Sequence, residues 1–171
     1  MIRRASWPKA QAASGWDEYD ATGVLTRMVP ALAARDERIA ALLCGFEAAK
    51  GTAEQNRYFQ RMFEVVMGEW LVDGSGMDGV EGFEAFQRRV QATLDALMRA
   101  ATSRRVVVFT SGGPIGLLMQ HVLRAPVQSF LDVNWRVRNC SITEFVFGGG
   151  RISLDSFNGV LHMEPSLWSF R

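Results

Sequence analysis

A run of apolar residues that ends in a small polar turn, VVVFTSGGPIGLLMQHVL at positions 106–123, most constrains what this chain can fold into. Residues 105–110 predict a β-strand in which the apolar side chains do not alternate with polar ones. A strand that is apolar on both faces is typical of the buried middle of a parallel sheet. Pro114 suits the first turn of a helix, and the apolar pattern continues to Leu123. We therefore expect a buried strand, a tight turn and a helix, in that order.

The turn between this strand and this helix has the composition of an anion site. Backbone N–H groups point outward at the start of a helix, where the helix dipole adds partial positive charge, and this combination suits phosphate. Gly112 and Gly113 allow a ligand to approach the backbone closely, and Thr110 and Ser111 add hydroxyl donors. A plain connection, whose glycines serve only to let the helix pack, explains the same residues equally well.

The turn does not match the better-defined glycine motifs. It lacks the GxxxxGK[ST] pattern of a P-loop and the GxGxxG pattern of a dinucleotide-binding fold. It is not the GxSxG nucleophile elbow either, because Phe109 stands where the first glycine belongs. The turn alone therefore leaves an anion site and a plain connection equally open.

The rest of the chain predicts helices before the strand and a β-hairpin after it. Apolar residues recur at intervals of three and four from Val80 to Leu97, as in an amphipathic helix. The β-rich runs SITEFVF and RISLDSF flank three glycines at positions 148–150, which predicts an antiparallel hairpin. Residues 1–15 show no clear period and predict an irregular tail. Residues 16–171 then form one α/β domain with a mixed sheet.

Composition excludes several classes of partner and site. The 19 Lys and Arg residues nearly balance the 18 Asp and Glu residues, which argues against nucleic acid and gives no reason to expect a membrane surface. No stretch approaches about 20 apolar residues, so we expect no transmembrane helix. Cys44 and Cys140 are far apart, which favours a reduced cytoplasmic setting over a disulfide framework. With only His121 and His162 and no paired cysteines, we expect neither a metal site nor a cofactor.

Four segments, in the same order along the chain, resemble motifs of the histidine phosphatase superfamily, the phosphoglycerate-mutase-like proteins. VVVFTSGGPIGLLMQ is similar to the family's second signature, an apolar strand, Ser-His-Gly-Gly and a helix. FEAFQRRVQATLDAL resembles its F-x-x-R-V helix, NCSITEF its N-x-S-[IV]-T strand, and WDEYD a segment that carries an acidic residue of the site. The resemblance runs from residue 16 to the C-terminus. It implies a three-layer α/β/α fold with a mixed, mainly parallel sheet and a C-terminal antiparallel hairpin.

The resemblance also implies a chemistry, hydrolysis of phosphomonoesters through a phosphohistidine and without a metal. In the family the nucleophilic histidine lies in an Arg-His-Gly motif, and a second histidine, two arginines and an acidic proton donor complete the pocket. The cationic groups stabilise charge on the phosphoryl group, and the acid protonates the leaving oxygen. By position, Glu18 matches the acid and Ser111 the second histidine.

This sequence departs from the family pattern in two ways. It contains no Arg-His-Gly, as though the chain began after the family's first strand, first helix and second pocket arginine. Ser111 also places a hydroxyl, which carries no positive charge, where the family has an imidazole. We therefore expect a catalytically impaired member that keeps a phosphate-binding turn at Thr110, Gly112 and Gly113. Its expected ligand is a small phosphorylated metabolite or inorganic phosphate.

Other interpretations stay open at this stage. Glu18 is equally a solvated residue beside a helix start, and Ser111 a helix N-cap. Arg136 and Arg138 of WRVRN are either phosphate donors or exposed arginines before a strand. Loss of a central strand invites association, such as a homodimer, so a non-enzymatic interaction module with a vestigial pocket is the alternative function. Ser111 as the nucleophile of an acyl hydrolase needs a histidine base that no motif places nearby.

Overall fold

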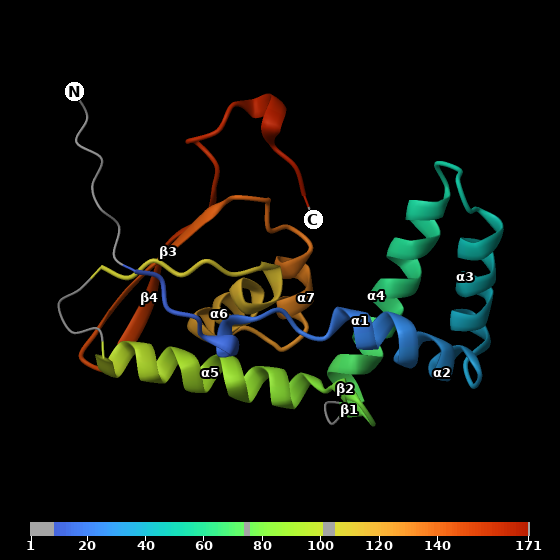
Figure 1. The fold of residues 1–171 in the computed structure, drawn as a ribbon, viewed down its shortest axis with the longest axis horizontal. Helices are drawn as coiled ribbons and strands as arrows, with labels where there is room; N and C mark the ends of the chain where they lie inside the picture. The colour runs from blue at the N-terminus through green and yellow to red at the C-terminus, as the bar shows by residue number, and fades with distance from the viewer. Residues whose placement is uncertain (1–8, 74–75, 101–104, 171) are drawn as a thin grey trace.

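The structure, a computed structural model, describes residues 9–73, 76–100 and 105–170. These residues form helices and two short antiparallel strand pairs, which agrees with the predicted mixture of α and β elements. In chain order the elements are η1 (Ser14–Trp16), α1 (Ala21–Gly23), η2 (Val24–Met28), α2 (Val29–Ala33), α3 (Glu37–Ala48), α4 (Gln55–Asp73), β1 (Gly76–Met77), β2 (Val80–Glu81), α5 (Phe83–Ala100), α6 (Gly112–Leu123), α7 (Ser129–Asn134), β3 (Ile142–Gly148), β4 (Arg151–Gly159) and η3 (Pro165–Leu167). In Figure 1, helices α1 to α4 lie at one end of the molecule, and α5, α6, α7 and the β3–β4 pair lie at the other.

Helices α3 and α4 pack side by side as a pair at one end of the molecule (Figure 1). Asp36 caps α3 by accepting the N–H of Arg38 at 2.8 Å, a role that aspartate fills well. Between the helices Phe59 packs against Phe46 and stacks on Phe63, with ring centroids 5.9 and 5.5 Å apart. Packing of apolar faces, more than intrinsic propensity, keeps such helices folded.

A cluster of aromatic rings joins the N-terminal segment to both groups of helices. Tyr19 contacts Trp70 of α4, Phe86 of α5 and Phe130 of α7, with ring centroids 5.2 to 6.4 Å apart. All four rings are buried. The indole N–H of Trp70 donates to the carbonyl of Glu81 at 2.8 Å, which satisfies its polar tip. Because Tyr19 belongs to this cluster, the residues beside it are held close to α5 and α7.

The predicted C-terminal hairpin is confirmed. Strands β3 and β4 pair antiparallel around the glycine turn, with Gly148 opposite Arg151 and Phe147 opposite Ile152. Exposed and half-buried residues alternate along β3, as expected for a sheet with one covered face. Phe145 and Ile152 are half-buried and pack against the core from this hairpin.

The predicted buried strand at residues 105–110 is wrong. This segment runs as a drawn-out connection in Figure 1, and the sheets of the described residues contain only β1 with β2 and β3 with β4. Val107 is 53% exposed and Phe109 is 86% exposed. A run that is apolar on both faces is buried only where other strands flank it, and no described strand pairs with it. For the same reason these residues do not form the mainly parallel sheet that the resemblance implied.

The N-terminal tail is described only in part. Residues 1–8 of the predicted irregular tail lie outside the described residues, and residues 9–13 contain no helix or strand. Further along the chain, Cys44 and Cys140 are both exposed and form no disulfide. Within the described ranges, no helix is both long and apolar enough to cross a membrane.

Candidate functional site

The predicted turn and helix start are present at residues 110–113. Helix α6 begins at Gly112, and Ser111 occupies the N-cap position with extended backbone angles. The hydroxyl of Ser111, however, makes no capping hydrogen bond. Gly112 and Gly113 are buried, whereas Thr110 is exposed. The N-cap interpretation of Ser111 is therefore right for its backbone and wrong for its side chain.

Glu18 supplies the missing cap from a distant part of the chain. Its Oε2 atom accepts the backbone N–H of Gly113 at 3.2 Å, and its Oε1 atom accepts the N–H of Tyr19 at 3.2 Å. A carboxylate is favourable at this end of a helix because the dipole is positive there. The structure thus brings Glu18 and the predicted turn together, although no local sequence pattern links them.

Gly113 is required by the closeness of this contact. A Cβ atom at position 113 would overlap the carboxylate of Glu18 and would lie 2.9 Å from a ring carbon of Tyr19. The glycine therefore lets an acidic side chain approach the helix backbone. This is the close approach that the sequence predicted, with a carboxylate of the protein itself in the position expected for a ligand.

Thr110 forms a second bridge between the turn and the N-terminal segment. Its hydroxyl donates to the carbonyl of Trp16 at 2.6 Å. Trp16 is buried and belongs to the core, so this bond fixes the turn relative to the residues just before Glu18. The hydroxyl that we expected to face phosphate is engaged within the protein.

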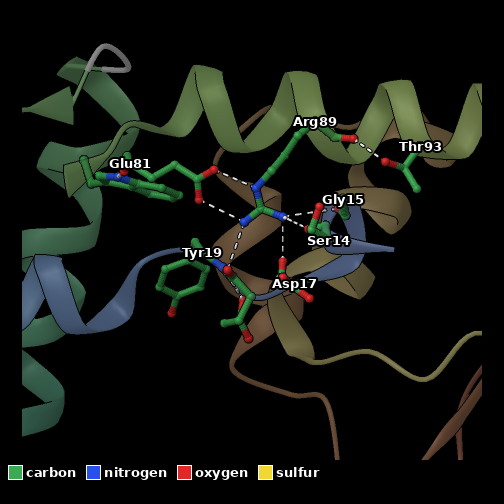
Figure 2. Close-up of polar contacts among 9 residues, drawn as sticks. Ser14, Gly15, Asp17, Tyr19, Glu81, Arg89 and Thr93 are labelled. Atoms are coloured by element: carbon green, nitrogen blue, oxygen red, sulfur yellow. Dashed lines mark hydrogen bonds and ion pairs between the residues drawn. The ribbon is translucent and has the colours of Figure 1, made fainter. Parts of the chain in front are cut away.

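Arg89 of α5 contacts the backbone of residues 14–18, the segment that contains Glu18. Arg89 was not identified as a site residue from the sequence. Figure 2 shows its guanidinium between Glu81 on one side and the backbone of residues 14–17 on the other. Its Nε and Nη2 atoms donate to the two carboxylate oxygens of Glu81 at 2.6 and 2.9 Å. These hydrogen bonds raise the pKa of Arg89 above its ordinary value. Arg89 is the arginine of the F-x-x-R-V pattern, and that pattern was the only signal for it.

An open hollow of about 620 Å³ lies beside this segment. The charged residues that line it are Asp17, Glu18, Asp20, Glu81 and Arg89. Four acidic side chains against one arginine disfavour an anion, because like charges repel. Residues 110–113 do not line the hollow. Asp20 is engaged as the N-cap of α1, where it accepts the N–H of Gly23 at 2.8 Å.

The histidines are exposed, and the WRVRN arginines stack on aromatic rings near the C-terminus. His121 is exposed in the last turn of α6, about 13 Å from Gly112 along the helix axis. His162 is exposed after β4. Arg136 stacks over Phe170, and Arg138 over the rings of Trp168 and Phe170, at 4.9 to 5.6 Å. In the part of the chain that the structure describes, no group of three metal-ligating side chains occurs.

Comparison with known families identifies a match. The model of the histidine phosphatase superfamily (branch 1) matches residues 47–159. This range contains α5 with Arg89, the turn and α6, and the β3–β4 hairpin, whereas Glu18 precedes it. Comparisons with curated proteins and with solved structures give no match.

Proposed function

The chain belongs to the histidine phosphatase superfamily (branch 1), and on this premise we propose that it binds a phosphate group at the N-terminus of α6 without hydrolysing phosphomonoesters through a histidine of its own. The ligand is a small phosphorylated metabolite or inorganic phosphate. The observation that supports the proposal most directly is the contact between Glu18 and the N–H of Gly113. A donor at a helix start that already holds an anionic oxygen is suited to an oxygen of phosphate.

Impaired catalysis follows from the side chains around this donor. Transfer through a phosphohistidine needs the nucleophilic imidazole of an Arg-His-Gly motif, which this sequence does not contain, and the position of the family's second histidine holds Ser111. At that second position a hydroxyl can donate one hydrogen bond to phosphate but cannot offset its charge as an imidazolium does. His121 lies at the opposite end of α6 and cannot replace it. The site therefore keeps backbone donors and an acid while lacking a nucleophile.

Turnover of a generic aryl phosphate by the purified chain tests this function. We expect no turnover by the wild-type protein or by the Glu18→Ala variant, and a phosphate-dependent shift of the Gly113 amide resonance in the wild type. Asp17→Ala is the matched control, because Asp17 is the exposed acidic neighbour of Glu18. Turnover that falls in Glu18→Ala but not in Asp17→Ala would show that Glu18 is a working acid and that the proposal is wrong.

A second candidate function, association of two copies of the chain, is favoured by the exposed segment 105–110. Its apolar side chains are uncovered, and no described strand pairs with its backbone. An exposed apolar edge of this kind is a template for pairing with another strand. Two copies present identical apolar edges, and a formal net charge of +1 gives little repulsion between them. The association state of the purified chain tests this function separately from phosphate binding.

A further inference from the structure

We propose that Arg89 is a positioning residue, which holds the backbone of residues 14–18 so that the carboxylate of Glu18 meets the N–H of Gly113. The inference rests on the proposed function in one respect: it takes the contact between Glu18 and Gly113 to be part of the phosphate site. Arg89 acts through other residues, since its guanidinium contacts neither the turn nor Gly113.

Arg89 collects four backbone carbonyls from one short segment (Figure 2). Its Nη1 atom lies 2.8, 3.2 and 3.4 Å from the carbonyl oxygens of Asp17, Gly15 and Ser14, and its Nη2 atom lies 2.9 Å from that of Glu18. The bonds to Gly15 and Glu18 are partly buried, and a carbonyl that loses its donor there is costly, whereas those to Ser14 and Asp17 are exposed. The guanidinium therefore sets the backbone path that leads into Glu18.

The hydrogen-bonding capacity of Arg89 is fully used by these contacts. A guanidinium carries five N–H groups in a fixed fork. Two of them donate to the carboxylate of Glu81. The other three donate to the four carbonyls, so the two N–H groups of Nη1 serve three acceptors. No donor remains for a phosphate oxygen unless the segment is released. Because its N–H groups are all engaged, Arg89 supports the position of Glu18 and does not bind phosphate directly in this conformation.

Contacts on α5 hold the guanidinium of Arg89 in place, so it fixes the backbone of residues 14–18 in one position. The carboxylate of Glu81 holds one edge of the guanidinium, and the ring of Phe86 lies 4.9 Å from its central carbon. The segment approaches α5 so closely that a Cβ on Gly15 would overlap the hydroxyl of Thr93. Rigid anchors on both sides leave the backbone before Glu18 little freedom to move.

The Gly113 amide resonance provides a readout that does not depend on activity. In the wild-type chain, Glu18→Gln should shift this resonance, because Glu18 accepts the Gly113 N–H. In an Arg89→Gln background we expect the shift caused by Glu18→Gln to be markedly smaller, because loss of the Arg89 hydrogen bonds lowers the population of the Glu18–Gly113 contact. Arg88→Gln is the matched control on α5, since Arg88 is exposed and pairs with Glu84, and it should leave the shift unchanged.

A conservative variant separates positioning from general support of the fold. Arg89→Lys keeps a positive charge near Glu81 but offers three donors from a single atom, so the folded variant should also show a reduced shift. A full shift in folded Arg89→Gln or Arg89→Lys would overturn the inference. Loss of the fold in both variants, seen by circular dichroism, would overturn it as well, because Arg89 would then support the whole domain.

Phosphate titration of the same samples keeps the two proposals distinguishable. Absence of any phosphate response in the wild-type chain would refute the proposed function. The Gly113 shift caused by Glu18→Gln would still test the positioning role of Arg89, because that measurement needs no phosphate. A normal phosphate response together with an unchanged Glu18 shift in Arg89→Gln would refute only the positioning role.

Discussion

The carboxylate of Glu18 accepts the backbone N–H of Gly113 at 3.2 Å, although 95 residues separate the two positions in the sequence. This contact makes a side chain from the N-terminal segment the effective cap of α6 and leaves the hydroxyl of Ser111 out of that role. It also places a negative charge where the proposed phosphate would bind. The acid therefore stabilises the helix start and competes with the ligand.

Removal of this competing charge should strengthen phosphate binding. We expect Glu18→Gln to bind inorganic phosphate about fivefold more tightly, since two unit charges about 4 Å apart in water repel by about 1 kcal/mol. Titration of the Gly113 amide with phosphate measures this change. Asp17→Asn should alter the affinity much less, because Asp17 is exposed and solvent screens its charge. An affinity that is unchanged or weaker in Glu18→Gln would contradict a shared site.

A side chain at position 113 should destabilise the protein. Gly113→Ala places a Cβ against the carboxylate of Glu18, and we expect a loss of about 1–3 kcal/mol in the free energy of unfolding. Urea denaturation measures it. Gly68→Ala is the control, because nothing lies within 4 Å of that position inside α4, and alanine should stabilise the helix there.

The overlap with Glu18 can be separated from other effects of Gly113→Ala by a double mutant. In a Glu18→Ala background the cost of Gly113→Ala should shrink, since the atom that it meets has been removed. Additive losses in the double mutant would show that the two residues do not interact.

Local patterns predicted the elements that depend on neighbouring residues. The hairpin at residues 142–159 follows from alternating side chains and a glycine turn, both of which act within a few residues. The start of α6 follows from Gly112, Gly113 and Pro114. These parts of the fold and the identity of the family were therefore accessible from the sequence.

Long-range features were not accessible in the same way. Burial of residues 105–110 depends on strands that lie beside them, and their own composition cannot supply those strands. Glu18 was identified by resemblance, while its position on Gly113 depends on how Trp16 and Tyr19 pack into the core. Arg89 was identified only as one residue of a helix motif, because four of its partners are backbone carbonyls, which no sequence pattern displays.

The pKa of Asp36 gives a pH dependence of stability. Its hydrogen bonds with Arg38 lower this pKa below the ordinary value of 3.8. The charged form is thus favoured in the folded state, and its contribution is present above the unfolded pKa and lost as pH falls through the folded one. Asp36→Asn keeps a capping side chain but removes the charge.

Thermal midpoints between pH 2 and 7 measure this effect. Asp36→Asn should melt below the wild type near neutral pH, and the difference should vanish at the acidic end. Asp155→Asn, at an exposed position in β4, should show no such trend. A difference between Asp36→Asn and the wild type that persists at the lowest pH would exclude the Arg38 contact as its source.

Substitution within the exposed segment should prevent two copies from associating. If residues 105–110 pair between copies, Phe109→Lys removes apolar burial worth about 1.5–3 kcal/mol and should raise the dissociation constant at least about tenfold. Sedimentation equilibrium over a range of protein concentrations measures it. Val72→Lys is the control, because Val72 is 82% exposed in the last turn of α4 and lies outside the segment. A wild-type chain that is monomeric at every concentration would exclude this surface. A Phe109→Lys variant that associates like the wild type would exclude it as well, because the apolar side chains of the segment are the only driving force proposed for the pairing.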